Sequence, residues 1–278
     1  MELRALTGVG WPALADVFTA AFSDYAVKLV MTADALAAMQ TRRGYDPAVS
    51  FGAYADDALV GFALTCRDDT TTPRHPRGGR IYNSGTGVVP AHRRTGLARR
   101  LIDAVIAACD APYVLEVLED NAGAIALYQA AGFAIIRRLQ CWSYDGPREE
   151  LGPRAELDAW HGSLARTFDV EPAWQNSLAS IARATEPYVT LGDARGYVVV
   201  FPATGDVPLL WVDPAARRRG HGRRLLAGAA ACANKPLRIL NVDASATGIA
   251  SFLAAAGCVA TVAQLEMGTV HTYSTSDA

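Results

Sequence analysis

The feature that most constrains this chain is an internal repeat with a period near 124 residues. The segment 88–101 matches the segment 212–225 at a constant offset of 124, and most paired residues are identical or similar. A second pair of segments, 127–132 and 252–257, matches at an offset of 125, so one residue is inserted between the two blocks. A period this long indicates duplicated domains rather than a solenoid of short repeats. The length of 278 residues agrees with two domains.

Composition and charge limit the class of protein. Hydrophobic residues make up 51% of the chain and charged residues 19%, as in ordinary globular domains. The formal net charge of −2 lacks the basic surplus that a nucleic-acid partner requires. No stretch reaches the roughly 18 apolar residues of a membrane span, and the N-terminus lacks the apolar core of a signal peptide. We therefore expect a cytoplasmic protein with neither a nucleic acid nor a membrane as its partner; a homodimer is left open.

The cysteines favour free thiols over disulfide bonds or a metal centre. They are odd in number, widely spaced, lack any CxxC pair and lie mostly in apolar segments: Cys66, Cys109, Cys141, Cys232 and Cys258. No His, Cys and Asp cluster has the spacing of metal ligands, so no metal is expected. His92 and His221 sit in arginine-rich turns, where a polar role beside an anion is favoured over metal binding, and His75 is taken as solvated.

Apolar periodicity predicts alternating strands and helices in both halves. In the first half we expect strands near 3–6, 50–54, 59–66, 81–89 and 113–118, two closing strands within 133–144, and helices at 11–22, 32–41, 96–109 and 122–131. In the second half we expect helices at 157–168 and 173–184 and strands near 188–191, 197–202 and 207–212. A polar loop spans 67–79. A linker at 146–153 divides domains at 1–145 and 154–278.

Both copies of the repeat contain a turn suited to binding a phosphate group. A strand ends in Val-x-Pro, and the pattern Arg-x-x-Gly-x-Gly/Ala then opens an apolar helix. Free backbone N–H groups and the helix dipole at such a start bind anions, and a pyrophosphate fits well. The first turn comprises Arg93, Arg94, Thr95, Gly96, Leu97 and Ala98; the second comprises Arg217, Arg218, Arg219, Gly220, His221 and Gly222.

Small residues at Gly96 and Ala98 would let a phosphate approach the backbone. The pattern alone is weak, and a plain basic helix cap is the alternative. Its recurrence at one offset, each time between an apolar strand and a helix, argues for the anion site. Neither a P-loop nor a Rossmann fingerprint fits, because the residues that those motifs require are missing.

Together with the segment Asn121-x-x-Ala124-x-x-Leu127-Tyr128-x-x-x-Gly132-Phe133, the first turn resembles the GCN5-related N-acetyltransferases (GNAT). The resemblance covers about 50–144 and, more weakly, 188–270. It implies an α/β fold of two GNAT-like domains, each a mixed, mostly antiparallel sheet flanked by helices. It also implies a cofactor cleft where the strand ending at Val89 splays from the strand at Tyr113, with the thioester in the cleft.

The same resemblance implies an acetyl-CoA-dependent N-acetyltransferase that acylates a primary amine of a small molecule or peptide, with acetyl-CoA as cosubstrate and no metal. The acceptor pocket would be built from 22–28, the loop at 67–79 and the strands after Phe133. A non-catalytic CoA-binding sensor or interaction module is the alternative from a different class.

Glu116 and Tyr128 are the candidate base and acid for transfer to an amine. Glu116 interrupts an apolar strand, where burial could raise its pKa, and a carboxylate facing solvent is the alternative. Tyr128 lies just before a helix stop, and a merely packed aromatic ring is the alternative. The Leu-Glu-Val strand with Tyr twelve residues later also resembles ribosomal-protein alanine N-acetyltransferases, in which these positions serve as base and acid.

Further groups are assigned to the cofactor. Backbone N–H groups at Val88 or Val89 would polarise the thioester carbonyl. Asn121 would either cap its helix or bond the pantetheine arm. In the second copy, Val212 and the second turn would line a matching cofactor groove.

The second copy lacks both proton-transfer groups. At the offset of 125, Asn241 replaces Glu116 and Leu253 replaces Tyr128. We therefore predict a degenerate or regulatory second domain that keeps a CoA-shaped groove. Asp206 or Asp243 could restore a base in another geometry, so catalysis in the second domain stays an alternative.

Overall fold

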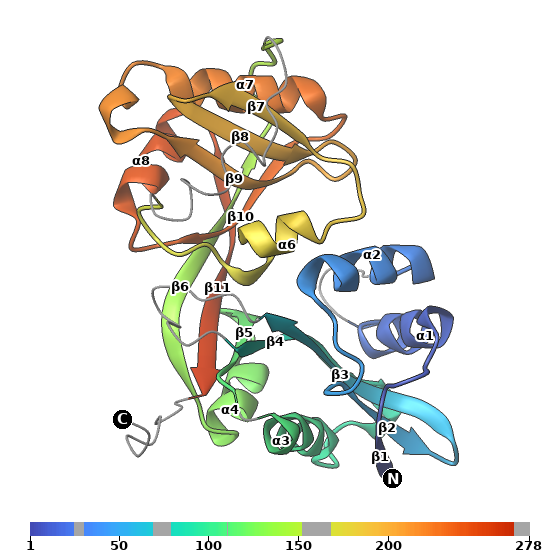
Figure 1. The fold of residues 1–278 in the computed structure, drawn as a ribbon. Helices are drawn as coiled ribbons and strands as arrows, with labels where there is room; N and C mark the ends of the chain where they lie inside the picture. Colours follow the sequence, from blue (N-terminus) through green and yellow to red (C-terminus); the bar gives the residue numbers. More distant parts are fainter. Residues whose placement is uncertain (25–30, 69–78, 110, 152–167, 270–278) are drawn as a thin grey trace, which may run out of the picture. The chain divides into compact units, whose positions relative to one another are not determined.

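The computed structural model describes residues 1–24, 31–68, 79–109, 111–151 and 168–269, which fall into two compact units (Figure 1). The first unit consists of residues 1–136 and the chain from residue 266 onward. The second unit consists of residues 137–265. Each unit is an α/β structure with its own strands and helices.

The first unit has a mixed sheet in the order β1-β2-β3-β4-β5-β11. Neighbours from β1 to β4 are antiparallel, whereas β5 runs parallel to β4. The expected mixed, mostly antiparallel sheet flanked by helices is thus confirmed. Its elements are β1 (Glu2–Ala5), α1 (Trp11–Ala21), α2 (Ala33–Arg43), β2 (Phe51–Ala55), β3 (Ala58–Asp68), β4 (Arg80–Val88), η1 (Pro90–His92), α3 (Leu97–Ala108), β5 (Tyr113–Leu118), α4 (Ala122–Ala130) and the end of β11 (Val259–Thr269).

The second unit repeats the element order that begins at β2 in the first unit: three strands, a 3₁₀ turn, a helix, a strand, a helix and a strand. Its sheet has the order β6-β10-β9-β8-β7. The repeat seen in the sequence is therefore a repeat of structure. The elements are β6 (Phe133–Tyr144), η3 (Trp174–Asn176), α6 (Leu178–Ala182), β7 (Val189–Asp193), β8 (Gly196–Phe201), β9 (Asp206–Val212), η4 (Pro214–Ala216), α7 (His221–Cys232), β10 (Leu237–Asp243) and α8 (Thr247–Ala255).

The strands β6 and β11 each begin in one unit and end in the other. Two closing strands were expected within 133–144, which is wrong, because this segment is the single strand β6. The expected linker at 146–153 does not coincide with the division. Arg148 Nη1 donates to the carbonyls of Ala230 and Ala233 at 2.9 and 2.6 Å, and Leu151 lies against Gly228. The described part of that segment thus packs on α7 within the second unit.

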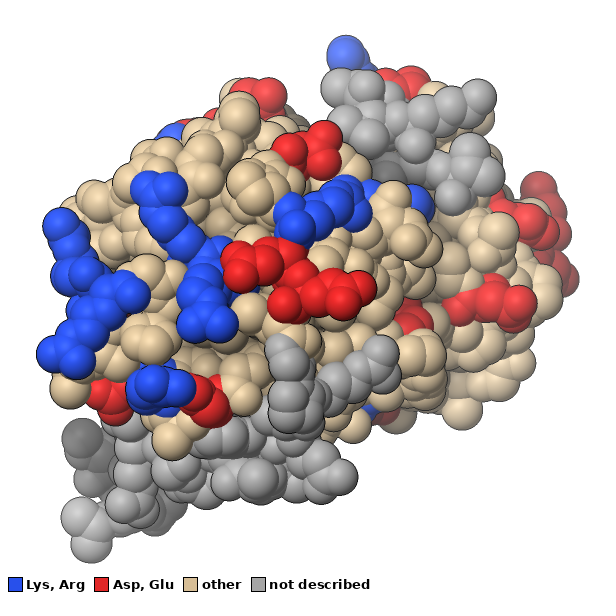
Figure 2. Space-filling model, turned by 90° about the horizontal axis from the view of Figure 1, so that it is seen from above, with Lys and Arg blue, Asp and Glu red and all other residues tan. Residues whose placement is uncertain are grey.

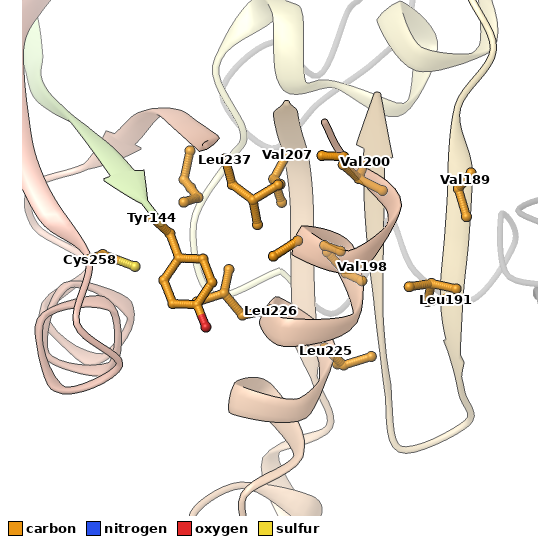
Figure 3. Packing of buried hydrophobic residues seen from close by; sticks show 14 of the residues in the cluster. Tyr144, Val189, Leu191, Val198, Val200, Val207, Leu225, Leu226, Leu237 and Cys258 are labelled. Atoms are coloured by element: carbon orange, nitrogen blue, oxygen red, sulfur yellow. The ribbon is translucent and has the colours of Figure 1, made fainter. Parts of the chain in front are cut away.

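Each unit has its own apolar core. In the second unit, Val198 and Val200 of β8 face Leu225 and Leu226 of α7, with Tyr144 of β6 beside them (Figure 3). In the first unit, α1 packs on the sheet with Leu14, Phe18 and Ala21, and the Phe18 and Phe62 rings stack at 5.4 Å.

Two helices were expected at the start of the second half of the chain. The helix expected at 173–184 is instead η3 followed by α6, with the Ser177 side chain capping α6. The helix expected at 157–168 lies almost wholly outside the described residues.

All five cysteines are free, as expected, and all but the half-buried Cys232 are buried.

Candidate active site

The candidate site lies in the first unit, where β4 and β5 part. Their parallel pairing runs from Ile81 with Tyr113 to Asn83 with Leu115, and β4 continues to Val88 paired only with β3. A cavity of about 640 Å³ opens there. It is lined by residues from the ends of α1 and β4, the first turn, the start of α3 and the start of α4: Ala21, Phe22, Asp24, Thr86, Gly87, Val88, His92, Arg93, Arg94, Gly96, Leu97, Ala98, Arg99, Asn121, Gly123, Ala124, Leu127 and Tyr128.

The first turn presents the start of α3 to this cavity. After η1, Arg94 and Gly96 adopt left-handed conformations, with φ of 60° and 77°. Gly96 then caps α3, and its carbonyl accepts from Arg100 N at 3.1 Å. A Cβ at Gly96 would meet nothing within 4 Å, so the glycine is required for its φ rather than for room. The N–H groups of the first helical turn have no partner within the helix and are available to an anion.

Arg93 was predicted to bind the cofactor, but its guanidinium is largely engaged within the protein. Nε donates to the Val88 carbonyl at 3.0 Å and Nη2 to the Ala21 carbonyl at 2.7 Å. Nη1 and Nη2 also bind both carboxylate oxygens of Asp24, at 2.7 and 2.8 Å. The pair with Arg93 lowers the pKa of Asp24. Although Arg93 also lines the cavity, these bonds tie the turn to the ends of β4 and α1.

The second copy contains the same arginine clamp. Arg217 Nε donates to the Val212 carbonyl at 2.9 Å, and Nη1 pairs with Asp169 at 2.9 Å. Arg218 and Gly220 repeat the left-handed conformations, with φ of 62° and 85°. The sequence comparison missed the acidic partners because Asp24 lies 69 residues before Arg93, whereas Asp169 lies 48 residues before Arg217. No single offset therefore aligns them.

The two valines predicted to polarise a carbonyl differ in the structure. Val89 N donates to the Val60 carbonyl at 2.9 Å, so this N–H is already used and the assignment of Val89 is wrong. Because hydrogen-bonded and non-hydrogen-bonded pairs alternate in an antiparallel ladder, Val88, opposite Gly61, directs its N–H away from β3. That side of β4 is where β5 has departed. Val88 thus keeps its assignment.

Tyr128 and Asn121 both reach the cavity from α4. Tyr128 is 9% exposed, and its ring packs on Phe133 with centroids 5.6 Å apart. It therefore combines the packed aromatic of the alternative reading with a place in the cavity wall. Asn121 lies in the same wall, and its Oδ1 accepts from Ala124 N at 3.1 Å. The capping role predicted for Asn121 is confirmed.

Glu116 does not line this cavity. It follows the last residue of β5 that pairs with β4, is half-buried, and its Oε2 accepts a hydrogen bond from the hydroxyl of Tyr82. The alternative of a carboxylate pointing freely into solvent is wrong. Burial, and then the neighbouring Glu116 carboxylate, raise the pKa of Tyr82 well above its usual value. Sequence reasoning missed Tyr82, because β4 also contains Asn83 and Ser84 and nothing in the sequence distinguishes the tyrosine from these polar residues.

In the second copy, the position of Glu116 falls on a β-bulge. The register between β10 and β6 shifts between Ile239 and Val242, where Asn241 has a φ of 55°. The β10 strand starts at the offset of 124 and ends at 125, so the bulge is the inserted residue. Asn241 is buried, and its Oδ1 lies 3.3 Å from Cys141 Sγ. The position is thus part of the packed interior.

Both alternative bases in the second copy, Asp206 and Asp243, form ion pairs with arginines. Asp206 pairs with Arg238 at 2.7 Å, and buried Asp243 pairs with Arg137 at 3.1 Å. Asp243 also accepts from the Ser245 hydroxyl. Each carboxylate has a structural partner, which argues against a proton-transfer role.

The second turn differs from the first in what covers it. A Cβ at Gly222 would lie 2.9 Å from the Phe252 ring. In the first copy, Ala98 and Leu127 stand at these two positions, and both line the cavity. In the second copy, the Phe252 ring therefore packs at the place that forms part of the open cavity in the first copy.

Other predicted site features lie outside the described residues. These are His75, most of the acceptor segment 22–28 and most of the loop at 67–79. Among the residues that are described, no group of three or more His, Cys, Asp or Glu side chains could hold a metal ion. No helix in those same parts of the chain is long and apolar enough to cross a membrane.

A comparison with models of protein families found a match over part of the first unit. Residues 11–133, which include the cavity wall from α1 to α4, match the model of the Acetyltransferase (GNAT) family. This segment is a GNAT-family domain. The match ends at residue 133, before the second copy. The comparison with curated proteins found no match.

Solved structures extend the likeness of fold to nearly the whole chain. A GCN5-related N-acetyltransferase from Sphaerobacter thermophilus is 15% identical, with a TM-score of 0.69 over 96% of this chain and 95% of that chain. A structure from Pyrococcus horikoshii assigned as an acetyltransferase is 12% identical, with a TM-score of 0.69 over 98% and 89%. The glucosamine N-acetyltransferase region of a fungal multi-domain β-N-acetylglucosaminidase is 12% identical, with a TM-score of 0.62 over 91% and 36%. At these identities the likeness concerns the fold.

Proposed function

We propose that this chain is an acetyl-CoA-dependent N-acetyltransferase that acylates a primary amine of a small molecule or peptide, and that its first unit carries the chemistry. One observation carries the proposal. The cavity at the parting of β4 and β5 joins an anion-binding helix start, the outward N–H of Val88 and Tyr128 in one wall. The GNAT match over residues 11–133 supports acyl transfer in this unit.

The first turn and α4 fit a bound CoA thioester. The free N–H groups at the start of α3 would hold the pyrophosphate, with Gly96, Leu97 and Ala98 leaving the backbone accessible. Arg94 and Arg99 lie in the same wall and add positive charge. The pantetheine arm would then run between the end of β4 and the start of α4, which brings the thioester to Val88 and Tyr128.

The transfer requires five events at these groups. The amine attacks the thioester carbon, and Glu116 accepts the amine proton through water, since its carboxylate lies outside the cavity wall. The Val88 N–H stabilises the carbonyl oxygen as it gains negative charge. The C–S bond then breaks, and the Tyr128 hydroxyl protonates the departing thiolate. The products are the amide and CoA.

Release of free thiol from acetyl-CoA in the presence of an amine panel tests the proposed function. We expect at least one small or peptide amine to be acetylated, with the acetyl group confirmed by mass spectrometry. If CoA binds but no amine is acetylated, the chain is a CoA-binding sensor instead. On the face drawn in Figure 2, most of the Lys and Arg side chains lie in the left part, and most of the Asp and Glu side chains lie in the centre and right.

Calorimetric titration with CoA is expected to give one binding site per chain. The first copy offers an open cavity, whereas the Phe252 ring packs against Gly222 in the second. Two sites of similar affinity would show that the second groove opens, and would restore the expectation of a cofactor site at Val212 and the second turn.

Matched arginine variants separate the two turns in the same titration. Arg93→Ala is expected to weaken CoA binding about tenfold, because the turn loses its bonds to Val88, Ala21 and Asp24. Arg217→Ala removes the corresponding clamp of the second copy and should leave the CoA affinity unchanged. Equal losses in both variants would contradict the placement of the cofactor in the first unit.

A further inference from the structure

The Glu116 carboxylate is held by Tyr82, which does not line the cavity. Tyr82 lies on β4, paired with Val114 of β5, so its side chain and that of Glu116 project from the same face of the sheet. The Tyr82 hydroxyl donates to Glu116 Oε2. Tyr82 is only 4% exposed, which leaves its ring little freedom to move. The phenol therefore fixes the position of one oxygen of this carboxylate.

A second layer of contacts holds Tyr82 itself. Arg43, the last residue of α2, donates to the Ser84 hydroxyl and carbonyl at 2.9 and 3.3 Å. Its guanidinium lies over the Tyr82 ring, 6.0 Å from the centroid. The chain of contacts runs from α2 through the β4 ring to β5. It links the helix layer to the strand that carries the candidate base.

The charged and titratable groups around this contact come from three other elements, α2, β3 and β11. Arg43 approaches from α2, and Cys66 of β3 is paired with Tyr82 in the ladder. From β11, Glu266 lies on the same face as Glu116, because a Cβ at Gly268 would lie 3.3 Å from Val114 Cγ1 and each glutamate is two residues away. Since burial and Glu116 raise the pKa of Tyr82 well above its usual value, the phenol stays protonated and remains a donor at neutral pH.

We propose that Tyr82 is a positioning residue for the base: its hydroxyl orients the Glu116 carboxylate to accept, through water, the proton of the acceptor amine, and stabilises its ionised form. This inference rests on the proposed acyl transfer. A hydrogen bond to the ionised form of an acid favours ionisation. The base consequently stays ionised at lower pH than it would without Tyr82.

The pH dependence of kcat/KM in Tyr82→Phe tests the inference, using the full-length protein, acetyl-CoA and the best amine. We expect kcat to fall about tenfold with an unchanged KM for acetyl-CoA, and the acidic limb to move up by about one pH unit. Combining Tyr82→Phe with Glu116→Gln should cause no loss beyond that of Glu116→Gln alone.

Tyr144→Phe is the matched control, because it removes the hydroxyl of another buried tyrosine, bonded to the Pro147 carbonyl at 3.0 Å in the second unit. Its acidic limb should coincide with that of the wild type. An unshifted limb in Tyr82→Phe, whatever its stability, overturns the positioning role and leaves acyl transfer intact. A wild-type protein that acetylates no amine overturns both.

Discussion

Glu116→Gln is expected to lower kcat by about 10²–10⁴-fold while leaving the affinity for CoA unchanged. Glutamine keeps the size of the side chain and can still accept from Tyr82, but it cannot take a proton from the amine. CoA binding should survive because Glu116 lies outside the cavity that would hold the cofactor. Steady-state kinetics with the best amine, together with calorimetry, measures both quantities.

Two further variants accompany Glu116→Gln: one is a control for the loss of a carboxylate, and the other tests the candidate acid. Glu2→Gln changes an exposed carboxylate on β1 and should leave kcat unchanged. Tyr128→Phe removes the candidate acid and should also lower kcat, with a smaller loss for acyl donors whose thiolate leaves more readily. Wild-type kcat in both Glu116→Gln and Tyr128→Phe would remove the assignment of base and acid, even if acetylation itself is observed.

The parts of the site that could be predicted from the sequence are those encoded by short segments. The pattern from Arg93 to Ala98 determines a local backbone path, and it recurs from Arg217 to Gly222 with the same left-handed residues. The capping role of Asn121 likewise depends on neighbours three residues away. Apart from the segments 133–144 and 173–184, the described strands and helices lie within a few residues of the positions predicted from apolar periodicity, because they too are local.

The parts that could not be predicted depend on residues distant in the chain. Arg93 meets Asp24, and Tyr82 meets Glu116, only after the sheet forms. The strands β6 and β11 each begin in one unit and end in the other. This division does not change how side chains alternate between the two faces along each strand, so apolar periodicity cannot reveal it. The single inserted residue was visible as a change of offset, but only the structure shows that it forms a bulge at Asn241.

In the second unit, Arg137→Leu is expected to lower the free energy of unfolding by about 3–5 kcal/mol. Arg137 Nη1 binds Asp243 at 3.1 Å and the Glu171 carbonyl at 2.6 Å, and both side chains of the pair are less than 10% exposed. Leucine leaves the Asp243 carboxylate buried without its cation, a cost that exceeds the worth of the pair itself. Urea unfolding followed by tryptophan fluorescence suits the measurement, because Trp142, Trp174 and Trp211 all lie in this unit.

The loss of unfolding free energy expected for Arg137→Leu depends on pH. Burial alone would raise the pKa of Asp243, but the hydrogen bonds from Ser245 and the pair with Arg137 hold it below its usual value. A depressed pKa contributes stability that is complete above the unfolded value of about 4 and is lost as the pH falls through the folded value. The difference between wild type and Arg137→Leu should therefore shrink below about pH 4.

An exposed pair in the same unit serves as the control for the buried one. Arg195 pairs with Asp193 with both side chains more than half exposed, so Arg195→Leu should cost much less than Arg137→Leu at neutral pH. Because Asp243 follows the bulge that stands at the position of Glu116, a large loss in Arg137→Leu alone would show that this edge of the second copy serves folding. A loss no greater than that of Arg195→Leu would mean that Asp243 tolerates the absence of Arg137, and a proton-transfer role for Asp243 would then return to consideration.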